Sequence, residues 1–138
     1  MFDTTGTHNP AVINVLAVAV GGAVGSVLRY LASGLAHGAF RSTTFPIGTL
    51  LVNLAGCFLI GAGSELAESR GAFGPTARAF LFIGILGGFT TFSAFSNETF
   101  NLFRSGSTGM GWLNVGCQLA GGLGCVWLGR SLAFLAWR

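Results

Sequence analysis

The sequence predicts an all-α integral membrane protein with four transmembrane helices and a break in the third helix. Hydrophobic residues make up 51% of the 138 residues and charged residues only 8%, and the mean hydropathy is +0.70. A membrane-spanning helix needs ~20 mostly apolar residues, and four such runs fit within the chain. The 23 glycines also suit a membrane protein, because small residues let neighbouring helices approach closely. We expect a single four-helix membrane domain over residues 1–138.

The first helix is expected over residues 11–36. Gly21 and Gly25 lie four apart, which gives a smooth groove for another helix. Arg29 interrupts the apolar run about two turns before its expected end. Either its guanidinium snorkels to the interface, or it lies in a water-filled vestibule and raises the local concentration of an anion. The first ten residues contain no Lys or Arg, so we expect no cleaved signal peptide.

The second helix is expected over residues 46–65, after a polar connection in which His37 is interpreted as an ordinary loop residue. A proline at position 46 fits the first turn of a helix, where a missing N–H is harmless. Thr49 and Asn53 are four apart and therefore share one face. Such an asparagine either joins membrane helices by hydrogen bonds or faces a solute, and spacing alone does not decide between the two.

The third helix is expected over residues 76–103, after a polar link. Its central stretch, 84–98, reads GILGGFTTFSAFSNE. Gly87 and Gly88 weaken a helix there, and the hydroxyl residues that follow can pair with the loosened backbone groups. Irregular backbone at membrane depth survives only where protein buries it or water lines it. The stretch therefore predicts a broken helix at the centre of an ion or solute site.

Two phenylalanines on one face of this stretch, Phe92 and Phe95, would by spacing alone indicate core or lipid contact. Hydrogen-bonding side chains are interleaved with them, namely Thr90, Thr91, Ser93, Ser96 and Asn97. Because aromatic rings have a positive edge, a dehydrated small anion could meet ring edges and polar donors in turn. The exposed carbonyls of a broken helix would equally suit a hard cation such as Na⁺. Glu98 is expected to form an ion pair or hydrogen bond rather than to take part in transport.

The fourth helix is expected over residues 109–137. Asn114 and Gln118 are four apart on one face, and tryptophans lie near its two ends, as an aromatic belt requires. The three cysteines all lie in apolar segments without metal-ligand spacing, so we interpret them as small apolar fillers: Cys57, Cys117 and Cys125.

The basic residues are seven arginines, scattered singly at segment ends as topology determinants are. This distribution argues against nucleic-acid binding, which needs a clustered basic face. Four arginines fall on one side of the predicted membrane (Arg70, Arg78, Arg130, Arg138) and three on the other (Arg29, Arg41, Arg104). So small a bias does not select an orientation. Either other signals decide the orientation, or the chain inserts both ways and pairs as an antiparallel homodimer. No nucleophile–base pair, paired carboxylates or phosphate-binding loop is present, so we expect no enzyme.

Three motifs carry a resemblance to a known family. They are GGAVGSVLRY (Gly21–Tyr30), PIGTLLVN (Pro46–Asn53) and GGFTTFSAFSNE (Gly87–Glu98). In this order across four spans, the chain resembles the Fluc (CrcB) fluoride channels over nearly its whole length.

The resemblance implies a dual-topology homodimer whose two antiparallel pores remove toxic fluoride from the cytoplasm across the cell (inner) membrane. It also implies a structural, non-transported Na⁺ at the dimer interface, held by carbonyls at Gly87 and Thr90. Arg29 matches the vestibule arginine. The implied pore residues are Asn53, Phe92 and Phe95, joined in our prediction by Thr49, Ser93, Asn114 and Gln118, with Thr91, Ser96 and Glu98 in support. The fourth segment departs from the family pattern, because Asn114, Gln118 and Gly122 stand where many members carry a tyrosine and serines.

Two other classes stay open at this point. A small dual-topology drug exporter also packs four short spans into a dimer, but a proton-coupled exporter is expected to carry a membrane-embedded carboxylate in its first helix. The first expected span here has no Asp or Glu. A non-transporting membrane scaffold would explain the glycines but not the interleaved Phe, Thr, Ser and Asn.

Overall fold

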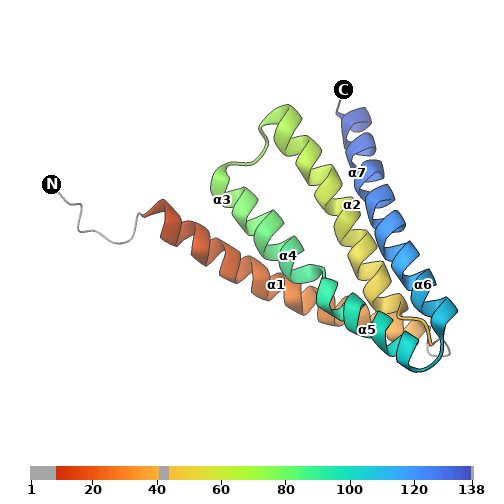
Figure 1. Ribbon diagram of the computed structural model, residues 1–138. Helices are drawn as coiled ribbons and strands as arrows, with labels where there is room; N and C mark the ends of the chain where they lie inside the picture. Colours follow the sequence, from red (N-terminus) through yellow and green to blue (C-terminus); the bar gives the residue numbers. More distant parts are fainter. Residues whose placement is uncertain (1–8, 41–43, 138) are drawn as a thin grey trace.

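The computed structural model describes residues 9–40 and 44–137, and these residues form helices and short connections without a strand. Four helical spans are long and apolar enough to cross a membrane (Figure 1). They cover Pro10–Ala39, Ile47–Arg70, Pro75–Arg104 and Thr108–Ala136. The chain is therefore an all-helical, multi-pass membrane protein. Arg41 and Arg138, which we expect on opposite sides of the membrane, lie outside the described residues, and so does His8.

Helix α1 (Pro10–Ala39) begins where its sequence provides a cap. The Asn9 side chain accepts a hydrogen bond from Ala11 N at 3.0 Å, and Pro10 occupies the first turn. The helix continues three residues beyond the expected end at position 36. His37 therefore lies in the last turn of α1, and the interpretation of this histidine as a loop residue is wrong.

Helix α2 (Ile47–Arg70) also runs further than its apolar residues indicate. It ends at Gly71, whose left-handed backbone (φ 59°, ψ 27°) closes the helix. Glu65, the expected last residue of this helix, and Glu68, expected in the polar link after it, are thus both helical. Both pair with Arg130 of the fourth span, at 2.7 Å from its Nη2 to Glu68 and 3.7 Å from its Nη1 to Glu65. These ion pairs explain why the polar last turns remain helical.

The third and fourth spans are each built from several helical pieces. The third contains α3 (Pro75–Arg78), a π-helical segment η1 (Ala79–Leu86), α4 (Gly87–Phe89) and α5 (Phe92–Arg104). The fourth contains α6 (Thr108–Gly116), a second π-helical segment η2 (Cys117–Gly121) and α7 (Gly122–Ala136). Wider π-helical turns inside α-helices are rare and shift which residues share a face.

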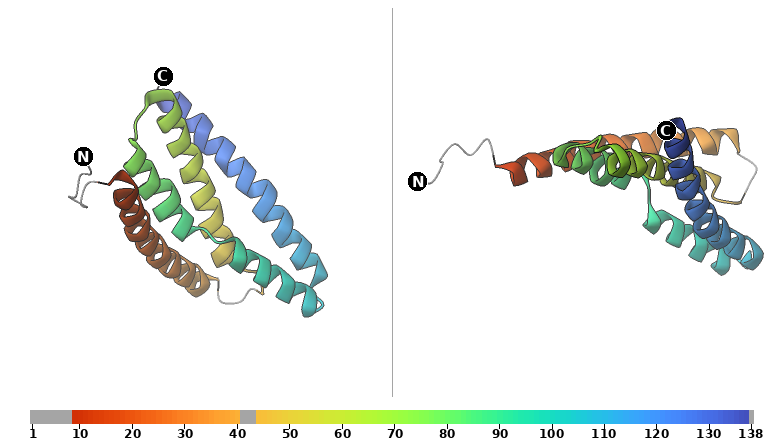
Figure 2. Two further views of the ribbon diagram at one scale, coloured as in Figure 1. Left: turned by 60° about the vertical axis from the view of Figure 1, so that its left-hand side comes forward. Right: turned by 90° about the horizontal axis from the view of Figure 1, so that it is seen from above.

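The spans lie side by side, with α1 at one edge, α7 at the other, and α2 and the first half of the third span between them (Figure 2). Helix α2 packs mainly on α7, and α1 mainly on η1 and α4. Glycines make these contacts close. A β-carbon at Gly25 would overlap the carbonyl oxygen of Ile85, and one at Gly129 would overlap that of Phe58. Close backbone approach between small residues is how helices associate in lipid.

The interior of the described chain is narrow and partly polar. The buried polar residues are Thr49, Thr99 and Asn114, and Asn114 is 0% exposed. Large apolar side chains instead cover the outer faces, as Leu123 (75% exposed) and Trp127 (70% exposed) show. Such a distribution suits a protein whose surroundings are lipid rather than water.

Candidate functional site

Two extended residues separate α4 from α5. Thr90 has φ −85° and ψ 159°, and Thr91 has φ −151° and ψ 113°. The Thr91 hydroxyl accepts a hydrogen bond from Ala94 N at 3.2 Å and so caps α5. The Thr90 hydroxyl donates to Leu86 O at 3.0 Å. The Thr91 hydroxyl thus satisfies a backbone N–H that an uninterrupted helix would have satisfied by itself, whereas Leu86 O also keeps its ordinary helical bond from Thr90 N at 3.0 Å.

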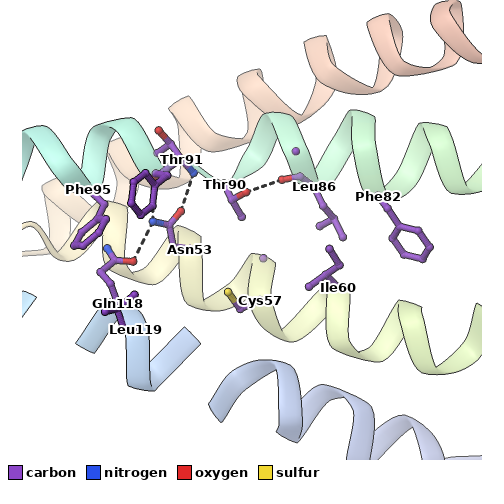
Figure 3. A pocket seen from close by; sticks show the side chains of 13 residues that line it. Asn53, Cys57, Ile60, Phe82, Leu86, Thr90, Thr91, Phe95, Gln118 and Leu119 are labelled. Carbon is purple, nitrogen blue, oxygen red and sulfur yellow. Dashed lines mark hydrogen bonds between the residues drawn. The ribbon is translucent and has the colours of Figure 1, made fainter. Parts of the chain in front are cut away.

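Asn53 of α2 binds this extended segment directly (Figure 3). Thr91 N donates to Asn53 Oδ1 at 2.8 Å, and Asn53 Nδ2 donates to Thr91 O at 3.1 Å. The same Nδ2 donates to Gln118 Oε1 of η2 at 3.0 Å. Since an amide nitrogen has two hydrogens, both donors of Asn53 are used within the protein. Gln118 Nε2 is buried and has no hydrogen-bond partner among the described residues.

The extended segment also redirects two backbone donors. In a continuous α-helix, the N–H of residue i+4 bonds the carbonyl of residue i. Thr91 N, the usual donor to Gly87 O, bonds Asn53 instead. Ala94 N, the usual donor to Thr90 O, bonds the Thr91 hydroxyl. Thr90 O accepts a longer contact, 3.4 Å, from Arg29 Nη1. These two carbonyl oxygens can therefore accept an outside partner.

A first cavity of about 320 Å³ lies beside this segment, between α2, the third span and η2. Six predicted site residues line it, namely Asn53, Gly87, Thr90, Phe92, Phe95 and Gln118, together with the supporting residue Thr91. The ring centroids of Phe92 and Phe95 are 5.4 Å apart with an edge-on geometry of 66°. Phe95 is 8% exposed, whereas Phe92 is 73% exposed.

A second cavity of about 910 Å³ lies between α1, α2 and α5. Its lining includes Arg29, Thr49 and Ser93, all predicted site residues. Thr91 lines both cavities, and its hydroxyl lies 3.2 Å from that of Ser93. The extended segment therefore borders both cavities.

Glu98 lies on α5 beside a further cavity of about 350 Å³. Its Oε1 accepts a hydrogen bond from the Thr49 hydroxyl at 2.7 Å, in keeping with the expected hydrogen-bonding role. Its Oε2 is buried without a partner in the described part of the chain. Ser96, the other supporting residue of α5, donates to Phe92 O of its own helix at 2.9 Å.

Asn114 lies apart from these cavities, although it was predicted to share a pore with Gln118. Its Nδ2 donates to the Thr99 hydroxyl at 2.8 Å, and that hydroxyl donates to Phe95 O at 2.7 Å. The amide is thus tied to the helix that carries Phe95. Sequence reasoning missed Thr99, although its position four residues after Phe95 on a helix could have indicated the bond.

Metal ligation by side chains finds no support in residues 9–40 and 44–137, where no three His, Cys, Asp or Glu side chains gather. The three cysteines are free and half-buried, and Cys57 lines the first cavity. The side chains that line the two cavities provide a guanidinium, an amide donor, hydroxyls and ring edges. This set suits a small anion, while the carbonyls of Gly87 and Thr90 suit a hard cation.

Four membrane spans with a polar site at mid-chain define the class of protein, a multi-pass membrane protein. The model of the family described as "CrcB-like protein, Camphor Resistance (CrcB)" matches residues 16–130. The chain belongs to this family.

Several curated relatives are similar over most of their length, and each is called "Fluoride-specific ion channel FluC". The protein of Shewanella amazonensis is 48% identical over 121 residues, which are 88% of this chain and 96% of the relative. That of Opitutus terrae is 48% identical over 120 residues, 86% of this chain and 90% of the relative. That of Geobacter sp. (strain M21) is 45% identical over 116 residues, 84% and 93% of the two chains. Ion channels are not enzymes, and the prediction of a non-enzymatic protein is confirmed.

Proposed function

We propose that this chain is a fluoride-selective channel that lets fluoride leave the cytoplasm passively across the cell (inner) membrane and so removes a toxic ion. The observation that carries the proposal is that Thr91 lines both cavities, in a chain similar to proteins called fluoride-specific ion channels. Conduction needs sites that an ion enters readily and leaves readily. A row of weak donors and ring edges provides such sites.

The proposed path starts at the cavity lined by Arg29, whose charge concentrates anions. It passes Thr49 and Ser93, reaches Thr91, and continues along the outer edges of the rings of Phe92 and Phe95. A fluoride ion that has lost water can meet hydroxyl donors first and ring edges next. The two rings are in edge-to-face contact with each other, so the ion passes beside this pair of rings.

The two amides of the first cavity take different parts in this path. Asn53 uses both of its N–H groups on Thr91 O and Gln118 Oε1, so it positions the extended segment rather than the ion. Gln118 retains a buried, unpartnered Nε2 beside the rings and is the amide that donates to the ion. Asn114 donates to Thr99 and so joins the fourth span to α5 outside the two cavities.

The proposed channel is an antiparallel homodimer with two pores. The ring of Phe92 is 73% exposed although it lines the first cavity, so one chain alone leaves the path open at this ring. Lipid would leave neighbouring polar groups without partners, whereas a second copy can close the path. The near-even distribution of arginines, four against three, allows the two copies to insert in opposite orientations.

A structural, non-transported Na⁺ at the dimer interface is part of the proposal. Gly87 O and Thr90 O are the carbonyls whose usual helical donors bond elsewhere, and carbonyl oxygens are ligands that a hard cation accepts. A bound Na⁺ would supply fixed positive charge and hold the extended segment in place. Arg29 Nη1 also contacts Thr90 O at 3.4 Å, so this carbonyl would serve both the guanidinium and the cation.

The rival classes have less support. A proton-coupled exporter needs an embedded carboxylate, and α1 carries none. Glu98 of α5 is bonded to Thr49. A non-transporting scaffold accounts for the glycine contacts but gives no reason for an unpartnered amide beside two aromatic rings.

The test is efflux of fluoride and of chloride from liposomes that contain the purified protein, followed electrically. Fluoride efflux without chloride efflux is the expected result. Equal efflux of fluoride and chloride would contradict the proposed selectivity for fluoride. Proton flux driven by an organic cation would favour the exporter, and absence of any flux would favour the scaffold.

A further inference from the structure

His37 occupies a position that the proposed path does not yet use. It lies in the last turn of α1 and lines the second cavity together with Arg29 and Thr49. It also lines the neighbouring cavity that contains Glu98. Its imidazole lies against α2, since a β-carbon at Gly48 would be 3.6 Å from His37 Nδ1.

The residue belongs to a row on one face of α1. Arg29, Ser33 and His37 follow each other at steps of four residues, and all three line the second cavity. A hydroxyl donor thus stands between two basic side chains. An anion that moves along this row toward Thr91 meets a nitrogen donor, a hydroxyl donor and a guanidinium in turn.

Few charged and titratable groups of the described residues face His37. Arg29 and Tyr30 come from α1 itself, and both line the second cavity. Glu98 comes from α5, where its buried Oε2 has no described partner. The α2 residues that line these cavities are uncharged among those described. Of these charged groups, Arg29 lines the second cavity itself and Glu98 lines the neighbouring one, so a charged imidazole would add a second positive charge to the cavity of Arg29.

We propose that His37 is a second anion-attracting group of the large cavity and makes fluoride entry depend on pH. Imidazole is the side chain whose charge changes between about pH 5 and pH 8. When it is protonated, the cavity carries one additional positive charge, which raises the local concentration of anions. When it is neutral, only its N–H donor remains. The inference rests on the proposed channel function and concerns how the same site is regulated.

The experiment measures fluoride efflux from liposomes at about pH 6 and about pH 8, equal on both sides. Efflux from protein-free liposomes is subtracted, because neutral HF crosses lipid unaided. One unit charge within a cavity of this size predicts a roughly two- to tenfold higher flux at the lower pH. High salt should reduce this ratio, because salt screens the added charge.

Three variants accompany the wild type. His37→Gln should show the lower flux at both pH values, and His37→Arg the higher flux at both. His8→Gln removes the other of the two histidines in the chain and should keep the ratio of the wild type. In that background His37 carries the remaining imidazole of the chain, so diethyl pyrocarbonate tests the proposal even if a position-37 variant fails to fold. Because the reagent also acylates thiols and phenols, hydroxylamine, which restores acylated imidazole but not acylated thiols, and a Tyr30→Phe background separate the effect on His37 from the others.

The outcomes separate the two proposals. Fluoride flux that is equal at both pH values in the wild type, or a pH ratio that survives in His37→Gln, overturns the role of His37 and leaves the channel function standing. Absence of fluoride flux at both pH values overturns the channel function, and the role of His37 with it.

Discussion

Asn53 and Thr91 are joined by two hydrogen bonds that run in opposite directions. Thr91 N donates to Asn53 Oδ1 at 2.8 Å, and Asn53 Nδ2 donates to Thr91 O at 3.1 Å. The side-chain amide of Asn53 thus pairs with the backbone of Thr91 as the backbone of a neighbouring β-strand would. Because lipid offers no hydrogen bonds, this pair is what allows an extended residue to persist between α4 and α5.

Replacement of Asn53 by Leu should destabilise the protein and stop conduction. The backbone N–H and carbonyl of Thr91 would both lose their partner, and each unsatisfied group is expected to lower the free energy of unfolding by about 1–3 kcal/mol. Thermal unfolding in detergent and fluoride efflux measure the two effects. Asn53→Asp keeps an acceptor for Thr91 N and should lose less stability. An unchanged unfolding temperature in Asn53→Leu would contradict this role.

The two pore phenylalanines should respond differently to replacement by Ile. Phe95 is 8% exposed and Phe92 is 73% exposed. Phe95→Ile should therefore lower the free energy of unfolding, by less than the ~3–5 kcal/mol typical of Phe→Ala. Phe92→Ile should change the packing within one chain by no more than about 0.5 kcal/mol, and any larger effect would come from the contact with the second copy. Both should reduce fluoride flux while the dimer, measured by cross-linking, persists. Full flux in both variants would exclude the rings from the path.

A glycine contact provides a test of the helix packing. Gly25→Ala places a methyl group against Ile85 O and should lower the free energy of unfolding by roughly 1–3 kcal/mol, as overpacking does. Gly38→Ala is the matched control in the same helix, since a β-carbon there meets nothing within 4 Å. It should be neutral or stabilising by up to ~1 kcal/mol. Equal unfolding temperatures for the two variants would mean that α1 and the third span are not in close contact.

Exchange of Na⁺ for a large organic cation should reduce fluoride flux without any transport of Na⁺. The proposed ligands, Gly87 O and Thr90 O, are backbone atoms, so Thr90→Ala should keep the dependence on Na⁺. Fluoride efflux and radioactive sodium uptake are measured on the same liposomes. Sodium that moves in a fixed ratio to fluoride would favour a symporter, and flux that is equal in both cations would remove Na⁺ from the site.

Hydropathy predicts the four spans well because each is a long apolar run. It ends α2 too early, at position 65, because the pairing of Glu65 and Glu68 with Arg130 joins residues more than sixty positions apart. Nothing local in the sequence indicates that contact. The prediction of a loop at His37 is wrong because a polar residue that follows an apolar run does not by itself end a helix.

Helical periodicity predicts that Asn114 and Gln118 lie on the same face, and the structure shows why this prediction fails. Residues four apart share a face in a regular α-helix, but Asn114 lies in α6 and Gln118 in the π-helical segment η2. The wider π-helical turn rotates Gln118 away from the face of the helix on which Asn114 lies. The sequence could therefore identify both amides as functional candidates but could not separate their positions.

The different positions of Asn114 and Gln118 can be tested by replacing each of them with Leu. Gln118→Leu removes the unpartnered donor beside the rings and should reduce fluoride flux strongly. Asn114→Leu removes the bond to Thr99 of a fully buried amide and should lower the free energy of unfolding by about 1–3 kcal/mol, while the protein that remains folded still conducts. Flux per folded dimer and unfolding temperature distinguish the two effects. If Asn114→Leu abolishes the flux of a dimer that stays fully folded, the ion passes Asn114 after all, and the fourth span contributes both amides to the pore.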